Sequence, residues 1–208
     1  MSIITLNNRS INRSDTATSG QVFTATSATA SDFQDPSSGL HKLISTATVS
    51  SSVSSIDLTG MDSTYQNYMV EIDNLVNAND EVQFQLRFIQ GGSTITDSNY
   101  WSQVCRQGIS EGVINTEESA NASAANIAHG VANNNNPQLN GRMFIYNAPT
   151  TDASTSFCAD ISLRHRDNHD HQKHDSHGEL RNTAASTGIT FKVSSGNITA
   201  GRFRLYGI

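Results

Sequence analysis

From about residue 41 onward, apolar and polar residues alternate with a period of two. The clearest runs are 82–88, 157–164, 189–193 and 202–206, in which large apolar side chains occupy every second position. Because successive side chains of a strand point to opposite faces, this pattern predicts half-buried β-strands. Weaker runs of the same kind bring the total to eight or nine strands; they span 42–49, 53–59, 67–76, 100–106 and 141–147.

The alternation also predicts which side chains form the core. The apolar positions of the four clearest runs should be buried, and the polar positions between them should face water or a neighbouring subunit. The expected core residues are Phe84, Leu86, Phe88, Ile161, Leu163, Phe191, Val193, Phe203 and Leu205.

Turn signals separate the strands, and helices are scarce. Residues 77–80, Gly91-Gly92 and 195–197 have the composition of turns. The polar stretch 108–140 is expected to be a long loop, with 117–129 as its best candidate for a helical turn. Many short strands with no crossover helices predict an all-β protein, specifically an antiparallel β-sandwich of jelly-roll type over residues 41–208.

Residues 1–40 differ from the rest of the chain. They are rich in Ser, Thr, Ala and Asn, and they contain few large apolar side chains with which to pack on themselves. We expect an extended N-terminal arm that becomes ordered on a partner, although an arm without a role is the alternative. Within it, Arg9 and Arg13 are either contacts to acidic groups of a particle or solvated side chains.

Composition excludes several classes of function. The net charge is −6, and no apolar stretch reaches the length of a membrane span, so nucleic-acid binding and membrane insertion are not expected. Cys105 and Cys158 are interpreted as two buried, reduced thiols, because two distant cysteines form no disulfide framework. The motifs of serine hydrolases, zinc proteases and P-loop enzymes are absent from the sequence, so no enzymatic activity and no obligatory cofactor are expected.

Five of the seven histidines fall between residues 165 and 177. Three interpretations remain open: a solvated polar loop, a transition-metal site, or a contact to a neighbouring subunit. A metal site would draw its ligands from His169, His171, His174 and His177. In a trimer, the HxH pairs of three chains could together surround one ion.

Aromatic residues offer one further candidate. Tyr100 and Trp101 could stack on a sugar ring, or they could belong to the core or an interface.

Two segments resemble bacteriophage proteins. Residues 20–26, GQVFTAT, are similar to an element of phage tail-fibre and appendage proteins, and 195–208 end in the pattern SGNI followed by LYGI. The resemblance covers 20–106 and 180–208 best, and it departs at the histidines of 165–180.

The resemblance implies a non-enzymatic virion structural protein: a tail fibre, a head fibre or a capsid decoration, assembled in the bacterial cytoplasm. Its expected partners are other virion proteins of the capsid or tail, together with copies of itself, a homotrimer being favoured. The alternative is a carbohydrate-binding module that recognises a host-surface glycan.

The sequence generates a prediction for the arm. Limited proteolysis of the isolated protein should cleave between about residues 14 and 40 and leave the remainder intact, because that segment has too few apolar residues to form a core. Mass spectrometry of the fragments checks this. Full protection of the segment in the isolated protein would contradict it.

Overall fold

The computed structural model describes residues 22–25, 31–34, 41–108, 114–133, 138–165 and 171–208. The chain divides into two compact units, residues 1–42 and 43–208. In the first unit, β1 (Val22–Ala25) and β2 (Ser31–Gln34) pair in antiparallel fashion, with Val22 opposite Gln34. The predictions for Arg9 and Arg13 lie outside the described residues, and the arm itself stays a prediction.

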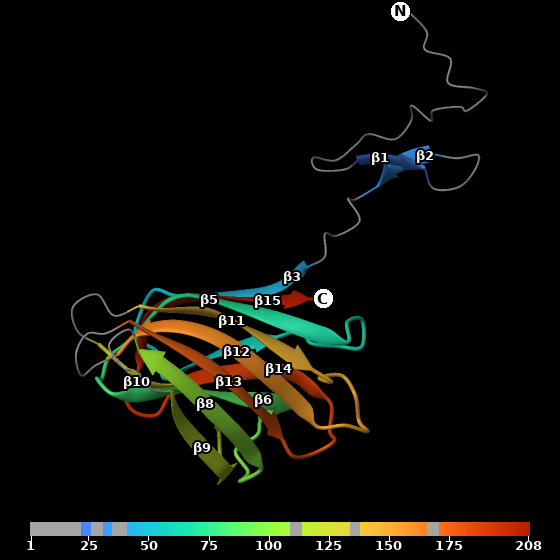
Figure 1. Ribbon diagram of the computed structural model, residues 1–208. Coiled ribbons are helices and arrows are strands. Elements are labelled where there is room, and N and C mark those ends of the chain that lie inside the picture. Colours follow the sequence, from blue (N-terminus) through green and yellow to red (C-terminus); the bar gives the residue numbers. More distant parts are fainter. Residues whose placement is uncertain (1–21, 26–30, 35–40, 109–113, 134–137, 166–170) are drawn as a thin grey trace, which may run out of the picture. The chain divides into compact units, whose positions relative to one another are not determined.

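The second unit, called the body, contains two antiparallel sheets (Figure 1). The larger sheet has eight strands. In their order across the sheet they are β3 (Lys42–Val49), β15 (Ile198–Gly207), β5 (Asn67–Asn77), β11 (Leu139–Tyr146), β12 (Thr155–Arg164), β13 (His171–Leu180), β8 (Tyr100–Gly108) and β9 (Asn115–Ala122).

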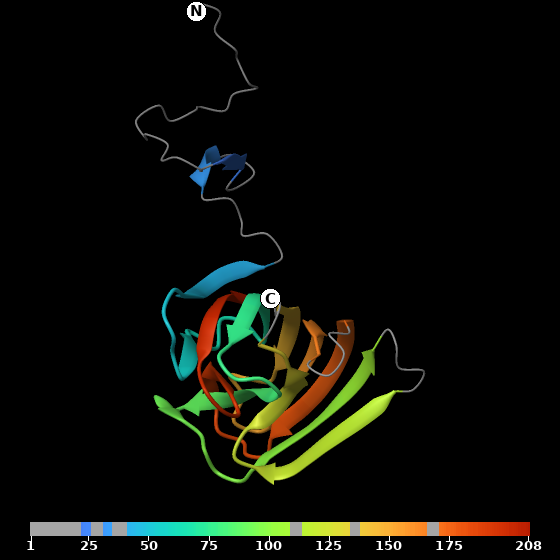
Figure 2. The ribbon, with the colours of Figure 1, turned by 90° about the vertical axis from the view of Figure 1, so that its left-hand side faces the viewer.

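The smaller sheet has five strands and lies against the larger one. Across it run β10 (Ala125–Val131), β6 (Val82–Gln90), β14 (Ser186–Val193) and β4 (Ser55–Thr59), and the short β7 (Ser93–Thr94) pairs with β6. Figure 2 shows the two layers curving around a common interior. The described residues contain no helix, and hence none with the length and hydropathy of a membrane span.

One apolar core joins the two sheets. Phe84 of β6 stacks on Phe191 of β14 with 5.4 Å between ring centroids. Phe203 of β15, in the opposite sheet, lies 5.3 Å from Phe191 and 6.4 Å from Phe84. All nine side chains predicted to form the core are buried, at 2% exposure or less.

The nine predicted strands are all confirmed, since each falls on a strand of the body. The turn predictions are confirmed as well. Gly91 and Gly92 connect β6 to β7 with φ values of 56° and 80°, which favour glycine because other residues rarely adopt them.

Three predictions were wrong. The expected loop 108–140 contains β9 and β10, so 117–129 is not helical. The histidine segment, which was not among the predicted strands and for which a solvated loop was one interpretation, forms β13 from His171 onward. Cys105 and Cys158 are free thiols as expected, but they are half-buried rather than buried, because both lie on the outward side of the larger sheet.

The core yields a stability prediction. Phe84→Ala should lower the free energy of unfolding by about 3–5 kcal/mol, since it removes a fully buried ring from the junction of both sheets. Chemical denaturation measures the change. Ser55→Ala, at an exposed position of β4, is the control and should stay within about 0.5 kcal/mol of the parent. A Phe84→Ala protein as stable as the parent would refute this description of the core.

Candidate functional site

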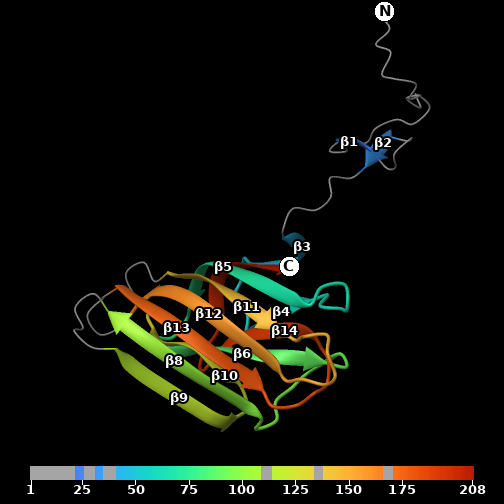
Figure 3. The same ribbon diagram turned by 45° about the vertical axis from the view of Figure 1, so that its right-hand side comes forward.

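A groove crosses the outward face of the larger sheet, over β9, β8, β13, β12 and β11. Its volume is about 560 Å³, within the usual range for small-ligand sites. Figure 3 shows β12, β13, β8 and β9, four of the five strands that carry it, side by side. We call it the outer groove; the lining side chains that matter most are Trp101, Gln103, Glu118, Tyr146, His177 and Glu179.

Strand register places two aromatic residues at opposite ends of the outer groove. Trp101 pairs with Glu179, Glu179 with Ser156, and Ser156 with Tyr146. Strands in a sheet are about 4.8 Å apart, so the Cα atoms of Trp101 and Tyr146 are roughly 14 Å apart. The small side chain of Ser156 lies between them.

Polar contacts fix the side chains at the tryptophan end. The guanidinium carbon of Arg181 lies 3.7 Å from the centroid of the Trp101 ring, and Arg181 Nε donates to Glu179 Oε1 at 2.7 Å. Two residues further along β8, on the same face, Gln103 Nε2 donates to Glu118 Oε1 at 2.9 Å. Trp101, Glu179, Gln103 and Glu118 are therefore held in place before any ligand arrives.

Tyr146 forms the other end. It is 37% exposed, and its hydroxyl lies 3.4 Å from Cys158 Sγ. The hydrogen bond to Cys158, with a contribution from burial, raises the pKa of Tyr146. The hydroxyl is therefore protonated at neutral pH, and its oxygen can accept a hydrogen bond from a ligand.

The structure separates the two aromatic residues considered for glycan contact. Tyr100 is fully buried; its hydroxyl accepts from Phe88 N at 2.8 Å and donates to Ile95 O at 3.1 Å. Burial raises the pKa of Tyr100 to about 12. Trp101, one position later, points to the opposite face and lines the outer groove.

The candidate metal ligands are not brought together. In β13, His171 and His177 face outward while His174 is fully buried on the inner side. His171 and His177 are six residues apart, or roughly 20 Å along a strand; His171 lies 2.6 Å from Ser162 Oγ instead. His169 lies outside the described residues, and the rest of the described chain holds no group of three His, Cys, Asp or Glu side chains suited to a metal ion.

His174 belongs to a polar cluster inside the body. Its Nδ1 accepts the backbone N–H of His129 in β10 at 3.3 Å, and its Nε2 lies 3.0 Å from Gln172 Oε1. Since Nδ1 acts as an acceptor, the ring proton is on Nε2, which donates to Gln172. This arrangement is satisfied only by the neutral imidazole.

Further charged groups surround this imidazole. Arg106 of β8 lies 3.3 Å from His165 Nε2 and 3.6 Å from Glu117 of β9, and His129 Nδ1 lies 3.8 Å from the same Glu117 oxygen. A Cβ on Gly130, where φ is 64°, would collide with the His165 ring, so glycine permits this packing. Burial, with the nearby His165, Arg106 and His129, lowers the pKa of His174 to about 3.

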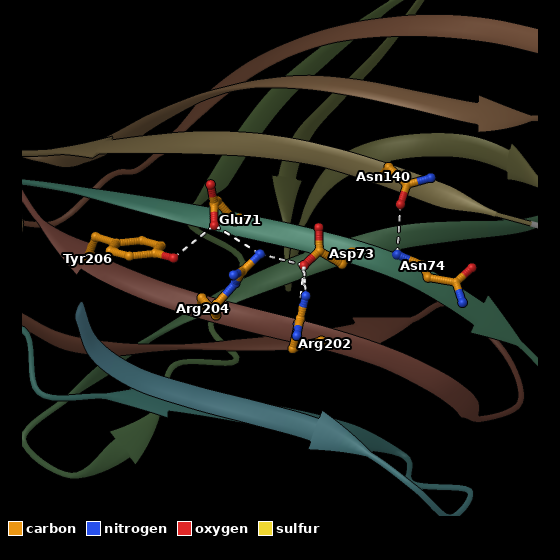
Figure 4. Close-up of polar contacts among 7 residues, drawn as sticks. All are labelled: Glu71, Asp73, Asn74, Asn140, Arg202, Arg204 and Tyr206. Atoms are coloured by element: carbon orange, nitrogen blue, oxygen red, sulfur yellow. Dashed lines mark hydrogen bonds and ion pairs between the residues drawn. The ribbon is translucent and has the colours of Figure 1, made fainter. Parts of the chain in front are cut away.

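A second polar network on the outward face is internally paired (Figure 4). Asp73 Oδ2 accepts from Arg202 at 3.0 and 3.2 Å and from Arg204 at 2.6 Å. Glu71 Oε2 accepts from the Tyr206 hydroxyl at 2.8 Å and lies 3.1 Å from Arg204. These charges neutralise one another and hold β15 in register with β5, so we assign them a structural role.

The sequence identified Trp101 as a candidate glycan contact and His177 as a candidate metal ligand, but not the other side chains of the outer groove. Gln103, Glu118 and Glu179 lie in different strands, and two of those strands, β9 and β13, were not among the predicted strands. Only the pairing of β13 with β8 and of β8 with β9 brings these side chains together.

Comparisons of the chain with protein-family models, curated proteins and solved structures find no match in any of the three.

Because of the polar cluster around His174, we expect the free energy of unfolding to depend on pH. The pKa of His174 is lower in the folded protein than the ordinary value of about 6.5 in the unfolded chain. The unfolded chain therefore binds more protons than the folded protein once the pH falls below about 6.5. The stabilisation is present above that pH and is lost as the pH falls toward 3, by up to about 1.4 kcal/mol per pH unit.

Denaturation at pH 7, 6, 5 and 4 tests this. The parent should lose stability more steeply than His174→Gln, whose side chain can also accept and donate. His171→Gln, at an exposed position of the same strand, should keep the parent slope. Equal slopes for the parent and His174→Gln would contradict the prediction.

Proposed function

We propose that this chain is a non-enzymatic structural protein of a bacteriophage particle. In this proposal, residues 1–40 attach the protein to other virion proteins of the capsid or tail, and the body projects from the surface or tiles it. The protein is assembled in the bacterial cytoplasm, and copies associate as a homotrimer.

The observation that carries the proposal is the order of the strands. In an eight-stranded jelly roll, strands 1, 8, 3 and 6 lie side by side in one sheet, and strands 2, 7, 4 and 5 in the other. The corresponding orders here are β3-β15-β5-β11 and β4-β14-β6-β10. The pairs β8–β9 and β12–β13 then extend the first sheet beyond β11. This match supports the jelly-roll assignment, and jelly rolls are frequent in viral capsid and lectin domains.

The division of the chain supports the attachment role. The body has its own core, while residues 1–42 form a separate unit. A compact domain carried on a separate segment suits a protein that docks through one part and exposes the other. Arg9 and Arg13 are the proposed attachment residues, since guanidinium groups form paired hydrogen bonds with carboxylates on a partner surface.

Fractionated particles test the proposal. Virions from cells that produce the protein, separated into heads and tails, should contain it in one of the two fractions by mass spectrometry. The double variant Arg9→Ala/Arg13→Ala should be incorporated less, with an unchanged melting temperature. Arg142→Ala/Lys173→Ala removes the same charge from exposed positions of the body and should be incorporated normally.

Two outcomes would contradict the proposal. Absence of the protein from both fractions would refute the virion assignment. Normal incorporation of the arginine variant would refute the role of the two residues in attachment.

A further inference from the structure

The outer groove combines features that the proposed attachment role does not use. Trp101 and Tyr146 lie at its opposite ends, three strands apart, with Glu179 and Ser156 between them in the register of the sheet. Exposed large apolar side chains are rare in the described chain, which has Leu43, Ile114 and Tyr146 as its three. An exposed aromatic ring at a groove end requires an explanation.

We propose that the outer groove is a binding site for an uncharged oligosaccharide, with Trp101 and Tyr146 contacting sugar rings and Gln103, Glu118 and Glu179 binding hydroxyl groups. The separation of the two aromatic side chains, roughly 14 Å across the strands, indicates a ligand of more than one sugar unit. Aromatic side chains with a polar atom suit such a ligand, because a sugar presents apolar C–H surfaces edged by hydroxyls.

Hydrogen-bonding capacity supports an oligosaccharide. Glu118 and Glu179 each have a second carboxylate oxygen beyond the one used by Gln103 or Arg181. The Gln103 amide adds its carbonyl oxygen as an acceptor and, beyond the N–H donated to Glu118, a second N–H as a donor. Sugar hydroxyls can both donate to these acceptors and accept from the donor, which a purely apolar ligand cannot do.

The charges of the outer groove disfavour acidic sugars. Two carboxylates line the groove, and the nearby cation, Arg181, is engaged by Glu179 and by the Trp101 ring. A ligand carboxylate, as in sialic acid, would be repelled by Glu118, and the charge of Arg181 is already balanced by Glu179. The site therefore favours uncharged sugars over anionic ones.

Pre-organisation strengthens the argument. The contacts of Trp101 with Arg181 and of Gln103 with Glu118 exist without ligand, so little side-chain entropy is lost on binding. Three adjacent strands, β9, β8 and β13, carry the side chains of Trp101, Gln103, Glu118 and Glu179, and the register of these strands fixes the spacing of the four residues.

Binding of the full-length protein to an array of neutral, amino and sialylated oligosaccharides tests the inference. Neutral oligosaccharides should bind, and titration calorimetry with the best of them gives the affinity. Gln103→Ala should weaken binding about tenfold, the loss of one hydrogen bond in the site. Trp101→Phe should weaken it less than Trp101→Ala, because the phenyl ring retains part of the contact.

Gln107→Ala is the matched control. Gln107 lies on the same strand and face as Gln103 but outside the outer groove, and its loss should leave the affinity unchanged. Melting temperatures identify any variant that has failed to fold, and Gln103→Ala, a half-buried position outside the core, keeps the test decisive if Trp101→Ala does not fold.

Three outcomes would overturn the inference: no binding of neutral oligosaccharides at millimolar concentration, a preference for sialylated ones, or binding that Gln103→Ala and Gln107→Ala affect equally. None of these bears on virion incorporation, so the attachment role is judged separately.

Discussion

The contact among Phe84, Phe191 and Phe203 is the interaction on which the rest of the body depends. Two of the rings come from the smaller sheet and one from the larger, and all three are fully buried. Once Phe203 faces inward, its neighbours Arg202 and Arg204 must face outward, because side chains alternate along a strand. The network of Figure 4 follows from that constraint. The orientation of every other strand in the larger sheet is then set through the register of its neighbour.

The sequence predicted the strands whose two sides differ in polarity. In β6 and β12, apolar residues alternate with polar ones, and both were identified together with their buried residues. β13 could not be identified in this way, because Gln172, His174 and Ser176 on its inner side are as polar as its outer residues. β9 has the composition of a loop and gains its strand geometry by pairing with β8. The polarity signal fails where the side chains on the buried side of a strand are themselves polar.

The candidate site shows the same limit. Trp101 could be selected from composition, but its adjacent residue Tyr100 could not be assigned to the core until the phase of β8 was known. The four strands beyond β11 create both unusual features of the body. Their outward side chains form the outer groove together with Tyr146 of β11, and their inward ones form the polar cluster facing β10. The addition of these four strands to the larger sheet thus accounts for both the outer groove and the buried polar cluster around His174.

The placement of β3 and β15 has a consequence for engineering. They are the first and last strands of the body, they are neighbours in the larger sheet, and Figures 1 and 2 show the C-terminus beside β3. The two ends of the body therefore lie close together, and domains with adjacent ends tolerate circular permutation. A short linker from Ile208 to His41, with new ends opened in the exposed turn at Asn79, would keep both sheets intact. A passenger protein fused there would be displayed from the turn between β5 and β6 and not from the edge where the chain enters the body.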